Sequence, residues 1–123
     1  MTLQNNAAQL DPEAIQRLRE LDPTGGNKLL ERVVAAFNGS LARLLPDLER
    51  ARSGDTLDLT VIRHVTHTLK SSSASLGAMA LSARCADIET MARDGHDEGL
   101  QEALDAMLQD IQQVRAALAA LLS

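Results

Sequence analysis

The sequence predicts an all-α fold, an antiparallel up-down four-helix bundle with a short extra N-terminal helix covering one end. Among 123 residues the apolar positions are mostly Leu and Ala, and Phe37 is the one aromatic side chain, a composition that favours helices over a sheet. Apolar residues recur every three or four positions along four long stretches, as one face of a helix requires. Short connections between such stretches favour an up-down bundle. At this length we expect a single domain over residues 1–123.

The first predicted helix is short and runs from Asp11 to about Leu21. Asp11-Pro12-Glu13 combines an N-cap residue, a first-turn proline and a first-turn acid. Residues 1–10 before it are expected to be loosely ordered. The segment 22–26, with one proline and two glycines, ends the helix.

The second predicted helix begins after Thr24 or Asn27, either of which can cap it, and ends at residues 53–55. Its apolar face keeps one phase along the whole length, through Leu30, Val34, Phe37, Leu41, Leu44, Leu48 and Ala51. That phase passes Pro46 unbroken, so we predict one long helix. A kink is expected at Pro46, because proline lacks the N–H group and crowds the preceding turn.

Three further helices complete the prediction. The third starts at Asp55 or Thr56 and stops at Gly77, and the fourth runs from about Met79 to Asp94. The fourth places Leu81, Cys85, Ile88 and either Met91 or Ala92 inward. The fifth, capped by Asp97, has an inward face of Leu100, Leu104, Met107, Ile111, Val114, Leu118 and Leu121.

The third predicted helix carries the reactive candidates. Its apolar face holds Ile62, Val65, Leu69 and Leu76, with Ser72 small enough for a close helix contact. The opposite face comprises Arg63, His64, His67, Lys70, Ser71 and Ala74. A neutral imidazole such as that of His67 is a nucleophile near pH 7, and it can accept a phosphoryl group and pass it on. On spacing alone, a surface histidine with no reactive role stays an alternative. So does metal binding by His64 and His67, which would need further ligands.

Residues 67–89 resemble the signature of histidine-containing phosphotransfer (Hpt) domains. The similarity rests on His67-x-Leu69-Lys70, Ser72-Ser73, Leu76-Gly77-Ala78, Leu81, Cys85, Ile88 and Glu89. Residues 10–13 and 21–26 also resemble openings found in that family. One departure is Ser71, because the family usually has glycine there, which leaves room for an incoming partner. Glu89 receives no role beyond a structural one.

The resemblance implies that His67 is the phosphoryl acceptor and that Lys70 supports the phosphate. Arg63, His64, Ser71 and Ala74 would then contact the partner. That partner would be a response-regulator receiver domain, which brings an aspartate and Mg²⁺, or a hybrid sensor histidine kinase. The expected function is phosphoryl transfer between receiver aspartates in a multistep phosphorelay. The alternative is a helical adaptor that binds a receiver or kinase without being phosphorylated.

Several classes of function are disfavoured by the sequence. A net charge of −5 argues against nucleic acid or an anionic membrane as the partner. No apolar run approaches the roughly 20 residues of a membrane span, and no signal peptide is recognisable. A single cysteine fits a reducing cytoplasm. Without a glycine-rich phosphate loop, the chain is expected to be a carrier and not a kinase. We expect a monomer with no metal or cofactor of its own.

Overall fold

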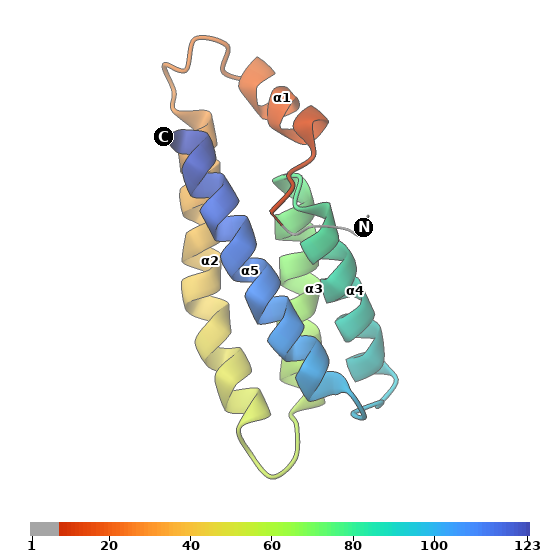
Figure 1. Cartoon of the computed structure of the whole chain (residues 1–123). Helices are drawn as coiled ribbons and strands as arrows, with labels where there is room; N and C mark the ends of the chain where they lie inside the picture. The colour runs from red at the N-terminus through yellow and green to blue at the C-terminus, as the bar shows by residue number, and fades with distance from the viewer. Residues whose placement is uncertain (1–7) are drawn as a thin grey trace.

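The computed structural model describes residues 8–123, and within them all regular structure is helical. The helices are α1 (Pro12–Glu20), α2 (Leu29–Arg52), α3 (Leu59–Ser75), α4 (Met79–Arg93) and α5 (Leu100–Leu122). The four long helices alternate in direction, and α1 lies across the end at which α2 begins and α5 finishes (Figure 1). The predicted bundle is therefore confirmed. The predicted loose start falls mostly on residues 1–7, outside the described residues, whereas Leu10 packs against the core.

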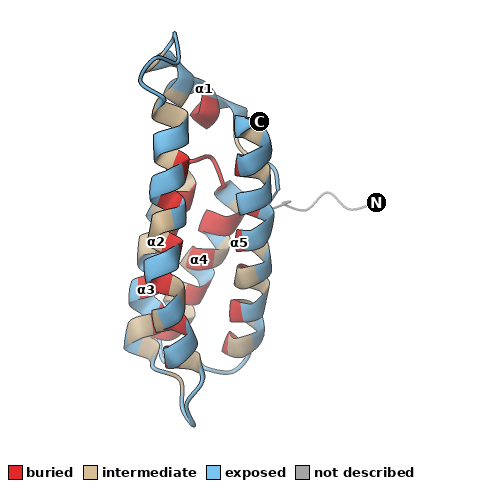
Figure 2. Cartoon of the chain, turned by 90° about the vertical axis from the view of Figure 1, so that its left-hand side faces the viewer, coloured by how far each residue is buried: buried red, intermediate tan, exposed pale blue. Residues whose placement is uncertain are grey.

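Each long helix packs against two others, since α3 and α5 each contact both α2 and α4. This arrangement places α3 and α5 diagonally across the bundle. Buried positions form stripes that face the middle (Figure 2), and they include nearly every apolar position predicted for the core. Of the two residues that the sequence left as alternatives for the inward position near the end of α4, Ala92 is buried and Met91 is half-buried. α2 continues through Pro46 as one helix, and a bend there stays a prediction.

The turn between α3 and α4 depends on Gly77. Its φ of +79° lies in the left-handed region that favours glycine. The Gly77 N–H donates to Ala74 O and the Ala78 N–H to Ser73 O, a Schellman arrangement that ends α3 as predicted. The Asp11 N–H donates to Gly77 O at 2.8 Å. A β-carbon at Gly77 would lie 2.9 Å from Asp11 N, so the glycine also allows the start of α1 to approach the turn.

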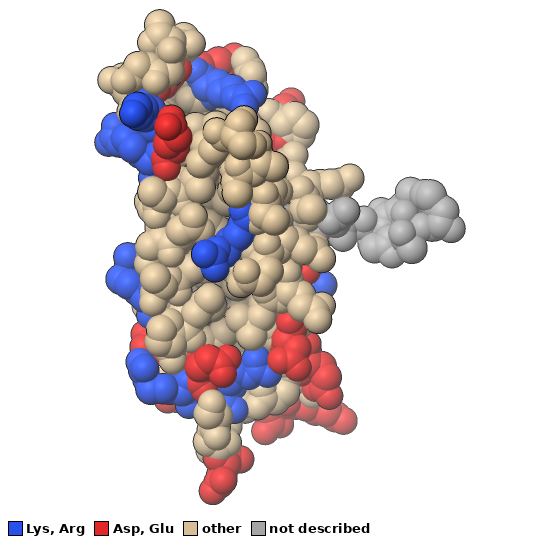
Figure 3. Space-filling view, turned by 60° about the vertical axis from the view of Figure 1, so that its left-hand side comes forward, with Lys and Arg blue, Asp and Glu red and all other residues tan. Residues whose placement is uncertain are grey.

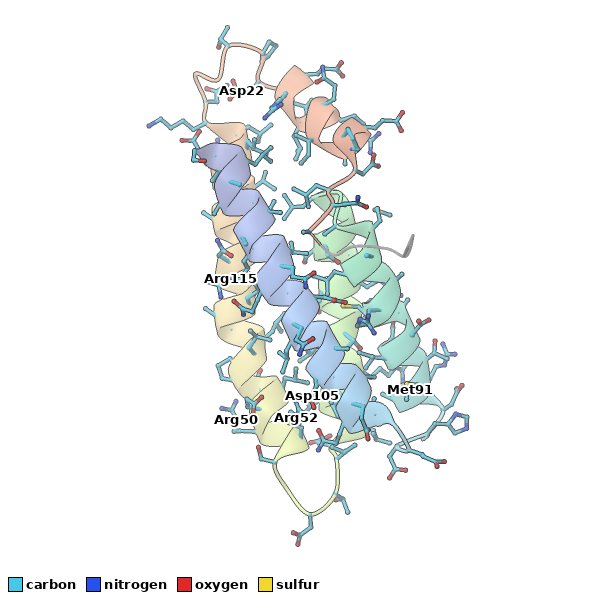
Figure 4. All side chains as sticks on the ribbon, in the orientation of Figure 1. Asp22, Arg50, Arg52, Met91, Asp105 and Arg115 are labelled. Atoms are coloured by element: carbon cyan, nitrogen blue, oxygen red, sulfur yellow. The ribbon has the colours of Figure 1, made fainter. Side chains whose placement is uncertain are left out.

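Three predicted helix starts were wrong, although the Asp11 cap of α1 is confirmed. α2 begins after Lys28, and Asp22, not Thr24 or Asn27, accepts from the Leu29 N–H at 3.1 Å. Asp22 reaches this helix start from the connection that follows α1 (Figure 4). α3 is capped by Asp58, not by Asp55 or Thr56, through the Val61 N–H. α5 begins after Gly99, which has a φ of +77°, so the Asp97 side chain does not cap it.

The opposite end of the bundle is joined by a polar contact between α2 and α5. The Arg52 guanidinium donates to Gln101 Oε1 at 2.9 Å and to Asp105 Oδ1 at 2.6 Å, and Gln101 Nε2 donates back to Arg52 O (Figure 4). Acidic side chains gather at this end (Figure 3), and residues 94–98 of the α4–α5 connection are exposed.

Within residues 8–123, no helix combines the length and the apolar character that crossing a bilayer requires.

Candidate functional site

The outward face of α3 is arranged as the spacing predicted. Arg63, His64, His67 and Ser71 are exposed, and Lys70 and Ala74 are half-buried. The opposite face is fully buried at Ile62, Val65 and Leu69. The serine that enters the helix contact is Ser73, which is 0% exposed, whereas Ser72 is only half-buried. The His67 side chain remains 63% exposed, so a partner can reach the imidazole.

Glu89 of α4 joins the two main candidates on α3. Its Oε2 lies 2.8 Å from His67 Nδ1, and its Oε1 accepts a hydrogen bond from Lys70 Nζ at 2.7 Å. The Glu89 side chain is 15% exposed, much less than the imidazole that it contacts. One carboxylate therefore holds both the histidine and the lysine. Sequence reasoning gave Glu89 no part in the site, although it closes the family-like pattern.

The contact with Glu89 determines which ring nitrogen of a neutral His67 carries the proton. A neutral imidazole carries one N–H group, and an ionised carboxylate can only accept hydrogen bonds. With Nδ1 beside Glu89, the proton belongs on Nδ1, and Nε2 keeps its lone pair. Nε2 is the ring nitrogen farther from the backbone, on a side chain that is mostly exposed. In its neutral form, the imidazole therefore presents an unprotonated nitrogen to the outside.

The charge of Glu89 is stabilised by its partners. The hydrogen bond from Lys70 lowers the pKa of Glu89 below the ordinary value of 4.5. Desolvation opposes this shift, and the hydrogen bond that His67 donates supports it. Because the pKa is lowered, the carboxylate is ionised at neutral pH. It can then fix Nδ1–H and balance the lysine charge at the same time.

We expect acid to weaken the fold partly through Glu89. A carboxyl whose pKa is lower in the folded state than in the unfolded state contributes stability above the unfolded pKa, and this contribution disappears as pH falls through the folded pKa. The lowered pKa of Glu89 therefore predicts a loss that begins near pH 4.5 and grows below it. Urea melts between pH 3 and 7 should show a smaller pH dependence for Glu89→Gln than for the wild type. Equal dependence in the two proteins would show that Glu89 is not stabilised in this way.

A shallow hollow surrounds the imidazole, lined by Thr60, Arg63, His64, His67 and Glu89. A second hollow lies between the end of α2 and the start of α3 and shares Thr60 and His64 with the first. Its other lining residues are Asp47, Arg50, Ala51, Asp58 and Val61.

In residues 8–123, no three His, Cys, Asp or Glu side chains gather as a metal site would require. Instead, His67 Nδ1 is engaged with Glu89.

Cys85 lies in the core, as predicted, and not in the site. It is 0% exposed, and its Sγ lies 3.8 Å from Met107 Sδ. Burial, with a smaller effect of Asp110, raises the pKa of the Cys85 thiol to about 12. A thiol that stays protonated is a poor nucleophile, so Cys85 acts as a packing residue.

Comparison with known proteins assigns the family. The profile of the Hpt domain matches residues 32–117, which include the whole site. Histidine-containing phosphotransfer protein 4 of Arabidopsis thaliana is 29% identical over 71% of this chain and 68% of its own length. Pseudo histidine-containing phosphotransfer protein 2 of Oryza sativa subsp. japonica is 27% identical over 77% of this chain and 63% of its own length. The chain belongs to the Hpt domain family.

Two solved structures share the fold. A putative histidine-containing phosphotransfer protein from rice superposes with a TM-score of 0.76 at 24% identity, covering 92% of this chain and 80% of the other. Histidine-containing phosphotransfer protein B of Pseudomonas aeruginosa PAO1 gives a TM-score of 0.69 at 24% identity, covering 90% of this chain and 91% of the other. These similarities confirm the helical bundle.

Proposed function

We propose that this chain is a phosphoryl carrier that moves a phosphoryl group between receiver-domain aspartates through His67. The observation that carries the proposal is the Glu89 carboxylate, which contacts both Nδ1 of the exposed His67 imidazole and Lys70 Nζ. Membership of the Hpt family supports a role in a phosphorelay.

In the proposed transfer step, these side chains have separate roles. Nε2 of His67 attacks the phosphorus of an aspartyl phosphate, so an N–P bond forms while the P–O bond to the aspartate breaks and its carboxylate leaves. The ring gains positive charge during the attack, and the Glu89 carboxylate at Nδ1 stabilises that charge. Lys70 lies one turn along α3, where its ammonium can pair with a phosphoryl oxygen. The reverse step returns the group to a second aspartate.

Magnesium in this proposal belongs to the partner. A receiver domain would bring the aspartate together with Mg²⁺, which balances charge on the phosphoryl oxygens. This chain would supply the imidazole, its carboxylate support and a cation. We therefore expect no labelled product from ATP and Mg²⁺ alone, but transfer from a phosphorylated receiver with Mg²⁺, stopped by chelation.

The chemical stability of the product separates a carrier from an adaptor. A phosphohistidine is labile in acid and stable in alkali, so wild-type chain incubated with a phosphorylated receiver should gain a phosphate with those properties. An adaptor would bind the receiver without gaining any mass. The adaptor stays the second candidate because one relative is named a pseudo histidine-containing phosphotransfer protein. A third possibility, a metal-binding bundle, predicts tight Zn²⁺ binding that depends on both His64 and His67.

The positive residues beside His67 are expected to steer the partner. Arg63 is exposed and lines the hollow at the imidazole, so Arg63→Glu should slow association with a receiver, mostly at low salt, because rim charges act on the encounter rate. Arg115→Glu is the matched control, since it makes the same charge change on α5, diagonally across the bundle. Stopped-flow binding should show a lower on-rate for Arg63→Glu only. Equal on-rates for both variants would exclude this face as the docking surface.

A further inference from the structure

A second residue of α4 contacts Lys70, at its backbone carbonyl and not at its side chain. Ser82 Oγ donates a hydrogen bond of 2.8 Å to the backbone carbonyl of Lys70. Ser82 is only 9% exposed, and the bond runs from α4 to α3. In the described residues, the other side-chain hydrogen bonds between these two helices are those that Glu89 accepts from His67 and Lys70. Within the described residues, the polar contacts between α3 and α4 thus converge on the site.

The geometry of an α-helix explains how α4 holds Lys70 at two points. Backbone carbonyls point toward the C-terminal end of their helix, whereas side chains lean toward the N-terminal end. The Lys70 carbonyl therefore meets Ser82, and the Lys70 ammonium reaches back along α3 to Glu89. Ser82 and Glu89 are seven residues apart, about two turns along one face of α4. Together with the Gly77 turn, these two bonds limit how far α4 can slide along α3.

We propose that Ser82 is a positioning residue for phosphotransfer, which acts through the Lys70 backbone to hold Glu89 at His67 Nδ1. Beyond the Gly77 turn and these bonds, α3 and α4 are joined by apolar packing, which is not directional. The bonds of Glu89 are 2.7 and 2.8 Å long, and a contact at about 3.6 Å no longer counts as a hydrogen bond, so a shift of under about 1 Å is enough to break them. Supporting bonds of this kind decide how well a reactive group is oriented.

The tautomer of His67 gives the most direct test, because Glu89 determines it. Nitrogen-15 NMR of the unphosphorylated protein should show mainly the Nδ1–H form in the wild type and a mixture of both tautomers in Ser82→Ala. Phosphotransfer from a phosphorylated receiver should be about three- to tenfold slower in Ser82→Ala, as expected for one lost hydrogen bond. Ser82→Thr keeps the hydroxyl and should restore both the tautomer and the rate to within about twofold of wild type.

A matched control uses another serine with the same kind of bond. Ser75 Oγ donates to Ser71 O, a bond that stays within α3, so Ser75→Ala should leave the tautomer and the rate unchanged. A wild-type tautomer in Ser82→Ala would overturn the proposal. A shifted tautomer with an unchanged rate would also overturn it, as would a loss that Ser82→Thr does not restore.

The prediction for the transfer rate depends on the proposed carrier function, whereas the prediction for the His67 tautomer does not. If the wild-type chain took no phosphate, the carrier function would fail, and the NMR comparison would still decide whether Ser82 positions Glu89 and His67. If the wild type took phosphate and Ser82→Ala matched it in both readouts, only the role of Ser82 would fail.

Discussion

Replacing Leu69 by alanine is expected to lower the free energy of unfolding by about 2–5 kcal/mol, as for other large-to-small changes in a core. Leu69 is 0% exposed and belongs to the main apolar cluster. By contrast, His67→Gln should change stability by no more than about 0.5 kcal/mol, since the side chain is mostly outside the core. The two residues are two positions apart on α3 but lie on opposite faces.

Urea unfolding followed by circular dichroism measures both effects in one experiment. The expected result is a clear shift of the midpoint for Leu69→Ala and almost none for His67→Gln. If both variants lost the same stability, the imidazole would be part of the core, and the orientation of α3 would be wrong.

Replacing Ser71 by leucine is expected to stop phosphotransfer while the fold persists. Ser71 lies four residues after His67 on the exposed face of α3, so a larger side chain there would stand beside the imidazole. The fold should persist because the position is exposed and leucine favours helices. The expected result is a receiver-to-chain transfer rate near background with an unchanged helical signal.

Two variants calibrate this prediction. Ser71→Gly should transfer at the wild-type rate or faster, at a cost of about 0.5 kcal/mol in helix propensity. Ser75→Leu places the same bulk one turn further along, at another exposed position, and should leave transfer unchanged. Transfer at the native rate in Ser71→Leu would refute a steric role for this position.

The bundle could be predicted from the sequence because the buried face of each long helix recurs every three or four residues. The same spacing is visible in the apolar residues of the sequence. The inward faces of α2 and α5 keep one phase over their whole lengths, and the structure buries Val34, Phe37, Leu104 and Ile111 as expected. Gly77 was recognisable as a helix stop because few other residues accept a positive φ.

The missed helix starts show where local rules compete. Asp55, Thr56 and Asp58 are all acceptable caps for α3, and the backbone selects Asp58, whose N–H also donates to Ala51 O of α2. Asp22 caps α2 from seven residues before Leu29, a distance that no short pattern covers. These choices depend on how the connections pack.

The role of Glu89 depends on the register between two helices. His67 lies ten residues before Gly77 and Glu89 lies twelve after it. In an antiparallel pair joined by a tight turn, residues at similar distances from the turn lie side by side. The similar distances of His67 and Glu89 from Gly77 could have been read from the sequence. The periodicity of each helix was considered separately, so this relation between two helices was missed. The hydroxyl of Ser82 is harder to find, because its acceptor is a backbone carbonyl.

The position of the phosphate tests the carrier role most directly. Wild-type chain, His67→Gln and His64→Gln should each be incubated with a phosphorylated receiver and Mg²⁺, then analysed by intact mass under alkaline conditions. We predict one added phosphate on the wild type and on His64→Gln, and none on His67→Gln. A phosphate on His67→Gln, or labelling of the wild type by ATP and Mg²⁺ without a receiver, would contradict the assignment of His67 as the phosphoryl acceptor of a carrier.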